Sequence, residues 1–266
     1  MLSLDAIFTG LSMGRFPFRT MHKLLLLVLV LALLAATLGF AQDPNYRLDK
    51  MMGTPIYAPR DVAVDRTGNA YLLDGGGVTK LDSTGRCDAG FSETPADRSG
   101  ANARTLGLDG AGNIYVCSYN ESSTPSAFVR KYGPAGNLLL QFGSVDTGPG
   151  QFQKLHGICV DAAGRVYIVD YMYSTPRLQC FDSRGVRLFE YTIPNATYAT
   201  HLADVDVDPA TGTIYLLEEN FFVTRLTTAG QFVSRVSMSG LGGGQYPSRA
   251  TAILLAANGE LLITGV

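Results

Sequence analysis

Two sets of polar side chains recur at matching places along this 266-residue chain and could together bind a charged ligand. Members of the first set come just before a short apolar run and are mostly basic: Arg60, Arg104 and His156, with Ala203 at the fourth occurrence. Members of the second set follow the next apolar run and are mostly acidic: Asp74, Ser118, Asp170 and Glu218. Cations opposite carboxylates would form a polar site for a charged ligand. The alternative is that the carboxylates only bond the connecting loops.

A second candidate is a cation site around Asp206. Asp204, Asp206 and Asp208 alternate along one extended run, so their side chains share one face. Carboxylates in such an arrangement suit a hard cation such as calcium. Asp204 corresponds to Asp61 in an earlier copy and Asp208 is a turn residue, so only Asp206 is unexpected. We therefore name Asp206 as the metal candidate, beside the alternative of a hydrogen-bonded carboxylate.

No catalytic constellation is evident, so we assign no catalytic residue. Only three histidines occur, and His156 and His201 alone cannot form a three-histidine zinc site. The chain has no Gly-x-Ser-x-Gly elbow, and its glycine runs have no helix pattern after them. We predict no cofactor, with calcium or zinc as the alternative.

The elements that must position these residues belong to a repeat. Each of the first four copies has an apolar run, an Asp, a turn Gly and a Tyr; the partial fifth copy has the apolar run and the Gly, with Ala256 in place of the Asp. The turn glycines lie 44, 52, 48 and 47 residues apart, in the order Gly68, Gly112, Gly164, Gly212 and Gly259. This spacing is typical of four-stranded propeller blades. We predict an all-β fold, a β-propeller of four-stranded antiparallel blades, with four complete blades and a partial fifth.

The third copy shows the expected strands most clearly. They are Gly157–Asp161, Arg165–Asp170, Arg177–Asp182 and Arg187–Tyr191. Asp-x-x-Gly segments between them fit tight hairpins, because Asp can bond the backbone ahead of it and Gly tolerates positive φ.

The same copy carries a family resemblance. Gly148-Pro149-Gly150-Gln151-Phe152, with the segments Gly157–Asp161, Gly164–Asp170 and Arg177–Asp182, resembles a nearly complete NHL repeat. The resemblance covers residues 59–266 and is weaker outside the third copy. It implies a six-bladed propeller, so we expect the sequence to be a fragment of a longer one. The alternative is a five-bladed ring closed by Tyr46–Tyr57.

The N-terminus has the pattern of an export signal. Residues 21–41 combine a basic start, an apolar run and a small-x-small site after Ala41, and residues 1–20 form an extension or an over-called start. An uncleaved membrane anchor is the alternative. Residues 42–58 are then a linker or closing strand, and we predict a secreted, periplasmic or cell-envelope location.

The net charge argues against nucleic acid as a partner, and the positions of the cysteines indicate their chemical state. Removing residues 1–41 takes away three bases and one acid, so the net charge falls from −2 to −4. The electrostatic footprint of nucleic-acid binding is therefore missing. Of the four cysteines, Cys117, Cys159 and Cys180 fall in expected strands and are predicted to be buried thiols, while Cys87 does not; a disulfide is the alternative.

Three functions are compatible with this sequence. The first is an exported, non-catalytic binding or scaffold module for a protein, peptide or glycan at the channel mouth. The second is a metal-dependent propeller lyase or hydrolase that resembles the peptidyl-hydroxyglycine amidating lyases or the lactonases. The third is a passive structural repeat in an envelope assembly. Membrane contact is expected only through an uncleaved signal anchor.

Overall fold

The computed structural model describes residues 59–74, 77–88, 91, 103–120, 125–171, 175–196, 200–238, 249–256 and 258–265. The predicted N-terminal extension (1–20), signal segment (21–41) and linker or closing strand (42–58) lie outside these residues. Within the described ranges, no helix has the length and apolar character needed to span a membrane.

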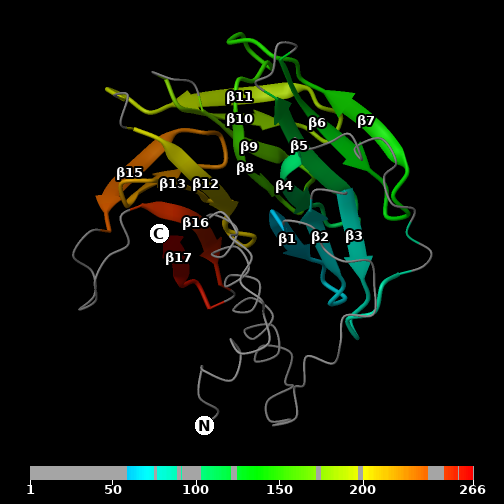
Figure 1. Ribbon diagram of the computed structural model, residues 1–266. Coiled ribbons are helices and arrows are strands. Elements are labelled where there is room, and N and C mark those ends of the chain that lie inside the picture. Colours follow the sequence, from blue (N-terminus) through cyan, green and yellow to red (C-terminus); the bar gives the residue numbers. More distant parts are fainter. Residues whose placement is uncertain are drawn as a thin grey trace, which may run out of the picture.

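The described chain is all-β, as predicted, and its strands form five antiparallel sheets (Figure 1). The first sheet has β1 (Asp61–Val64), β2 (Ala70–Asp74) and β3 (Gly77–Leu81). The second has β4 (Ala103–Leu108), β5 (Ile114–Asn120), β6 (Ser126–Tyr132) and β7 (Leu138–Phe142). The third has β8 (Leu155–Val160), β9 (Val166–Asp170), β10 (Arg177–Phe181) and β11 (Arg187–Thr192). The fourth has β12 (Leu202–Val207), β13 (Ile214–Glu218), β14 (Phe222–Leu226) and β15 (Phe232–Ser237), and the fifth has β16 (Ala250–Leu255) and β17 (Leu261–Gly265).

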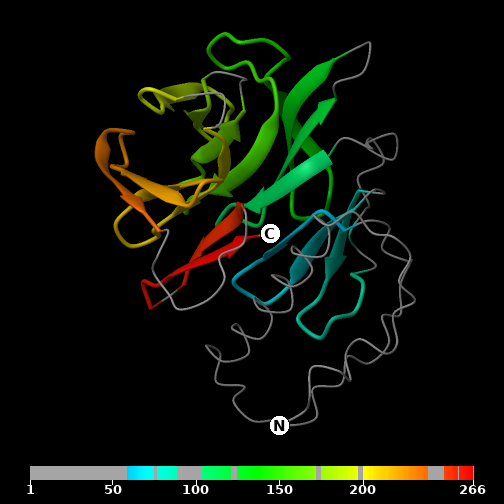
Figure 2. The ribbon, with the colours of Figure 1, turned by 60° about the vertical axis from the view of Figure 1, so that its left-hand side comes forward.

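These sheets are the blades of a β-propeller, numbered here in chain order. Strand order in each sheet follows chain order, so every blade is a simple meander. The first strands β1, β4, β8, β12 and β16 lie beside one another in that order, and the sheets fan out from them (Figure 2). The first strand of each blade is therefore the innermost strand.

Blade 2, blade 3 and blade 4 have the predicted four strands. Blade 1 has three strands among the described residues, and most of the segment 89–102 that would supply its fourth lies outside them. Blade 5 has the two strands predicted for the partial unit. The six-blade total stays a prediction.

The repeated Asp, Gly and Tyr form one hydrogen-bonded turn, seen well in blade 2. The Asp109 carbonyl accepts the Gly112 N–H at 3.0 Å, with Gly112 at φ +79°. Asp109 Oδ1 accepts the backbone N–H groups of Ala111 and Asn113, both at 2.9 Å. The Tyr115 hydroxyl then donates to Asp109 Oδ2 at 3.3 Å. The same tyrosine-to-aspartate bond occurs in two other blades, as Tyr71 to Asp65 and Tyr167 to Asp161.

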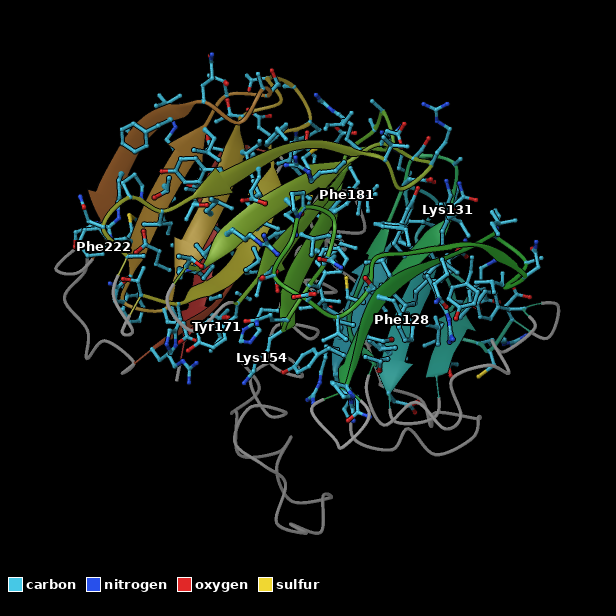
Figure 3. The ribbon with its side chains drawn as sticks, turned by 90° about the horizontal axis from the view of Figure 1, so that it is seen from above. Phe128, Lys131, Lys154, Tyr171, Phe181 and Phe222 are labelled. Atoms are coloured by element: carbon cyan, nitrogen blue, oxygen red, sulfur yellow. The ribbon has the colours of Figure 1, made fainter. Side chains whose placement is uncertain are left out.

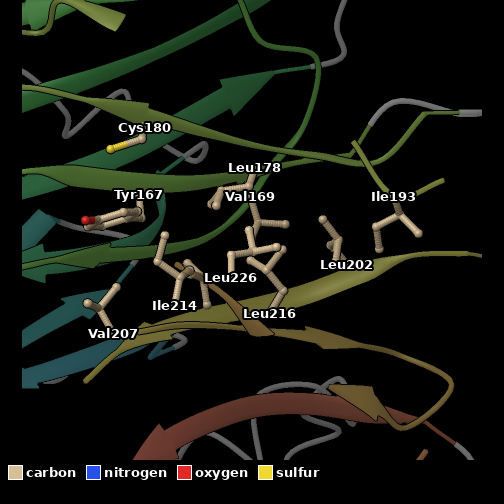
Figure 4. Close-up of a cluster of buried hydrophobic side chains, with 11 residues drawn as sticks. Tyr167, Val169, Leu178, Cys180, Ile193, Leu202, Val207, Ile214, Leu216 and Leu226 are labelled. Carbon is tan, nitrogen blue, oxygen red and sulfur yellow. The ribbon is translucent and has the colours of Figure 1, made fainter. Parts of the chain in front are cut away.

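The hydrophobic cores lie between blades rather than within them. One cluster joins Tyr167, Val169 and Leu178 of blade 3 to residues of blade 4 such as Ile214 and Leu216 (Figure 4). Three further clusters lie between the other neighbouring pairs of blades. Because each blade buries its apolar surface only against a neighbour, the sheets must stack around a centre.

Candidate functional site

A β-bulge marks the start of the innermost strand in blades 2 to 5. In blade 2 the pairing steps from Ala103–Ser118 to Thr105–Cys117, which leaves Arg104 as the extra residue. The equivalent register shifts leave His156, Ala203 and Thr251 as the extra residues of the following blades. In blade 1, Arg60 comes directly before β1 and donates its N–H to the Leu73 carbonyl at 2.8 Å. All four residues thus come at the start of an innermost strand, so the predicted set of Arg60, Arg104, His156 and Ala203 occupies structurally equivalent positions. In blades 2 to 4 the bulge also changes the direction of the side chain.

These positions lie at one end of the propeller, where innermost strands begin and second strands end; we call this end the channel mouth. The channel behind it is a cavity of about 560 Å³ lined by all five innermost strands. Its walls are largely aliphatic, and the bulge residues His156, Ala203 and Thr251 belong to its lining. A ligand at the mouth would therefore meet polar groups first and apolar walls beyond them.

Two arginines from neighbouring blades meet at this end. The Arg60 Nη1 group donates to the Ala103 carbonyl of blade 2. Burial first, and then the nearby Arg104 charge, lower the pKa of Arg60, while Asp74 acts in the opposite direction. Arg104 is exposed, with its guanidinium carbon 4.6 Å from the centroid of the Tyr119 ring.

The predicted acids lie at the same end but are used by the fold. Asp170 is fully buried, and its Oδ1 accepts the N–H groups of Gln153 at 2.8 Å and Lys154 at 3.0 Å. Its Oδ2 accepts Arg177 Nε at 3.1 Å and Nη2 at 3.0 Å. Burial is the main effect on Asp170 and raises the pKa of its carboxyl group despite these bonds. Asp170 therefore agrees with the alternative stated above, in which the carboxylate bonds a connecting loop.

Glu218 has a similar structural role. It is fully buried, and Arg235 binds its two oxygens at 2.7 and 2.6 Å. Asp74, also buried, accepts the Gly77 N–H at 3.1 Å. Ser118 is buried at the equivalent place in blade 2. Thus the structure brings the predicted acids to the mouth but turns Asp170 and Glu218 inward.

The channel aspartates bind neighbouring blades. Asp206 Oδ2 accepts the Leu255 N–H of blade 5 at 2.6 Å, and its Oδ1 accepts the Val207 N–H at 2.8 Å. The Cys159 thiol lies 3.4 Å from the same Oδ1. Within the described ranges, no three His, Cys, Asp or Glu side chains gather as metal ligands. The metal candidate at Asp206 therefore stays a prediction.

A further group of residues, of which only His201 was considered from the sequence, lies on the blade 3 to blade 5 side of the mouth. His201 Nδ1 lies 2.9 Å from Glu219 Oε2, and His201 Nε2 lies 3.1 Å from the Tyr171 hydroxyl. Arg249 Nη2 donates to the other oxygen of Glu219. The Lys154 ammonium lies 5.7 Å from the Tyr171 ring centroid, and Figure 3 shows these two side chains together.

A sequence signal for part of this group exists. Lys154, His201 and Arg249 each stand two residues before the bulge residue of their blade. This second basic position becomes apparent when the copies are aligned at the bulge residue. Tyr171 and Glu219 share the position one residue after the acid that ends the second strand.

Fold and site together define a β-propeller with polar residues gathered at its channel mouth. No protein-family model matches the sequence, and no curated protein matches it. Solved propeller structures do match. A Bacteroides caccae protein of unknown function aligns with a TM-score of 0.54 at 14% identity, covering 78% of this chain and 70% of that one.

Two further matching structures belong to proteins with a named activity or ligand. A gluconolactonase from Xanthomonas campestris aligns with a TM-score of 0.53 at 16% identity, over 78% of this chain and 69% of that one. The calcium-binding protein regucalcin from Agrobacterium tumefaciens aligns with a TM-score of 0.54 at 14% identity, over 75% of this chain and 64% of that one. The chain thus spans less than two thirds of regucalcin, and identities this low establish the fold alone.

Proposed function

We propose that this chain is an exported, NHL-like propeller that binds a protein, peptide or glycan at its channel mouth through an anionic group of that ligand. One observation carries the proposal: acids and bases at the mouth differ in exposure. Asp170 and Glu218 are fully buried and paired with arginines, and Arg249 is paired with Glu219, whereas Arg104 is exposed and Arg60 and Lys154 are half-buried.

This difference in exposure determines the sign of the charge that the ligand should carry. The charges of Asp170 and Glu218 are already matched by Arg177 and Arg235, so they add little net charge to the mouth. The more exposed bases supply positive charge around an apolar channel, and such a focused field attracts anions. Arg60 and Arg104 in particular come from neighbouring blades, so one carboxylate could contact both.

Export is the second part of the proposal and rests on residues 21–41, whose basic start, apolar run and small-x-small site match a signal peptide. The NHL assignment rests on the motif of the third copy. An exported propeller would meet peptides and envelope glycans rather than nucleic acid, in keeping with the acidic net charge.

A second candidate function is a lactonase-like hydrolase. One fold neighbour is a gluconolactonase, and the contacts of His201 with Tyr171 and Glu219 supply groups able to move a proton. As predicted from the sequence, this hydrolase is metal-dependent, and among the described residues no three His, Cys, Asp or Glu side chains form a candidate metal site.

Binding is tested by titrating the full chain calorimetrically with an oligogalacturonate, an oligoglutamate peptide and neutral maltohexaose. We expect an acidic probe to bind and to weaken between about 50 and 300 mM salt, since salt screens exposed charges. Arg104→Glu should weaken binding about tenfold, the equivalent of roughly 1.4 kcal/mol. Arg184→Glu is the matched control, because Arg184 is exposed at the opposite end of blade 3. Equal binding of neutral and acidic probes, or equal effects of the two substitutions, would contradict the proposal.

A further inference from the structure

A carboxylate, an imidazole and a phenol hydroxyl are in successive contact at the channel mouth. Glu219 Oε2 lies 2.9 Å from His201 Nδ1, and His201 Nε2 lies 3.1 Å from the Tyr171 hydroxyl. Tyr171 follows β9, His201 precedes β12 and Glu219 follows β13, so two blades build the group. Both contacts lie within the range expected of a nucleophile, its base and the residue that orients the base.

Backbone bonds hold this group in place. The Glu219 N–H donates to the His201 carbonyl at 2.9 Å, and the Tyr171 N–H donates to the Lys154 carbonyl at 2.8 Å. The Ala250 N–H of blade 5 donates to the Glu219 carbonyl at 2.8 Å. With Arg249 on the second oxygen of Glu219, the carboxylate has a defined orientation toward His201. Such support is what keeps catalytic groups in a productive geometry.

This arrangement defines the role of the histidine. A carboxylate that accepts the Nδ1 proton selects the tautomer with its lone pair on Nε2. That lone pair then faces the Tyr171 hydroxyl and can accept its proton. Positive charge lies close by, since the Lys154 ammonium is 5.7 Å from the Tyr171 ring centroid. The His156 ring lies 5.6 Å from the same centroid.

We propose that Tyr171, His201 and Glu219 form an acyl-transfer triad that acts on esters or lactones at the channel mouth. This goes beyond binding, and it rests on the proposed function only for the preference for substrates with an anionic group. His156 also lines the channel, so an acyl group at Tyr171 lies next to the aliphatic cavity. The Lys154 ammonium beside the Tyr171 ring can stabilise a developing oxyanion.

The reaction has two steps. Tyr171 oxygen attacks the carbonyl carbon while its proton moves to His201 Nε2, and collapse of the tetrahedral species breaks the bond to the alkoxide, which takes that proton. Water then attacks the acyl-tyrosine carbonyl, giving one proton to His201 and the hydroxyl to the acyl group, and the proton returns to the Tyr171 oxygen as it leaves. The products are an alcohol and an acid, or one hydroxy acid when the substrate is a lactone.

The test uses the full chain with p-nitrophenyl acetate, a small neutral ester that needs no anionic group. We expect release of nitrophenolate and an acetyl group on Tyr171, located by peptide mass spectrometry. Tyr171→Phe should abolish the adduct, and His201→Gln should slow release by about 100-fold or more, the usual contribution of a general base. Tyr215→Phe is the matched control, because Tyr215 is a phenol at the other end of blade 4.

The outcomes separate the two proposals. An adduct confined to other residues, or release unchanged in Tyr171→Phe and His201→Gln, would overturn the triad. The wild-type adduct is informative even if a variant fails to fold, and near-ultraviolet circular dichroism identifies such a variant. Oligogalacturonate binding without any Tyr171 adduct would sink the triad alone. An adduct without oligogalacturonate binding would support the triad and sink the proposed anion site.

Discussion

The Asp206 carboxylate of β12 accepts the backbone N–H of Leu255 on β16 at 2.6 Å, so a side chain of one innermost strand bonds the next blade. Asp204 makes the equivalent bond to Ile253 at 3.2 Å, and Asp61 bonds the Leu106 N–H of blade 2 at 2.9 Å. These carboxylates take the place of hydrogen bonds that a sheet would supply between strands. They therefore join blades whose main chains do not pair.

Asp206 should make stability depend on pH in a characteristic direction. Burial raises the pKa of Asp206 above its ordinary value of 3.8, despite the bonds from Leu255 and Val207. A carboxyl group with a raised folded-state pKa stabilises most below pH 3.8, and this contribution falls as pH rises through the folded value. Asp206→Asn should therefore gain stability relative to wild type between about pH 3 and pH 7. Urea denaturation of both proteins across this range measures the difference; an unchanged or opposite difference would contradict it.

The Asp170–Arg177 pair should contribute to the fold rather than to ligand binding. Removing one partner of a buried ion pair is costly, and Asp170→Ala would leave Arg177 with only the more exposed Glu190, 3.2 Å away, so it should cost about 3 kcal/mol. Arg177→Met should lower the free energy of unfolding less in the Asp170→Ala protein than in the wild type, because the two side chains share one interaction. Chemical denaturation of the four proteins checks this cycle. Additive losses would refute the coupling, and weaker ligand binding per folded molecule in Asp170→Ala would assign Asp170 to the site.

Replacing a glycine of the outer turns should reduce stability most where an aromatic ring of the preceding blade packs against that glycine. A Cβ at Gly230 would lie 2.4 Å from the Phe189 ring, and one at Gly185 would lie 2.6 Å from Phe142. Gly85 has a similar φ of +80° but nothing within 4 Å of its Cβ position. Gly85→Ala should therefore cost only about 1–2 kcal/mol of backbone strain. Gly185→Ala and Gly230→Ala should lose about 1–3 kcal/mol more through overpacking, measured by urea denaturation. Equal losses at all three positions would show that φ alone sets the cost.

Thiol reactivity should distinguish Cys87 from the other cysteines. All four are free thiols; Cys87 is exposed, Cys159 is half-buried, and Cys117 and Cys180 are buried. Burial raises the pKa of the Cys180 thiol to about 12 and that of Cys117 and Cys159 well above the usual value. Iodoacetamide at about pH 8 should label Cys87 first, because the thiolate is the reactive form. Peptide mass spectrometry gives the order, and native labelling of Cys117 as fast as Cys87 would contradict it. The prediction of buried thiols covered Cys117, Cys159 and Cys180; it is confirmed for Cys117 and Cys180, and Cys159 is half-buried.

Much of the fold was predictable because its signals are local. The Asp-x-x-Gly turn contains its own acceptor and its own positive-φ residue, so the hairpin from Asp109 to Gly112 follows from adjacent residues. The tyrosine three residues after the glycine is part of the same unit through its bond to the aspartate. Alignment of these copies was enough to place Arg60, Arg104 and His156 at equivalent positions.

The candidate site was predicted only in part. Position in the repeat indicated which residues reach the channel mouth, but not whether they face outward or inward. Asp170 turns inward because Arg177, which carries five donors and lies seven residues further on, binds its carboxylate. From the sequence, Asp206 was known only by its place between Asp204 and Asp208, and its bond to the Leu255 N–H of another blade could not be predicted.

The sequence by itself determined a repeating all-β chain with its turns, strands and a polar end to each blade, because those features depend on neighbours a few residues apart. Only the tertiary structure decided which charges remain exposed and which groups touch. Tyr171 and His201 are 30 residues apart and meet because blades 3 and 4 pack face to face. Contacts between blades depend on how whole sheets stack around a centre, and no local pattern records that geometry.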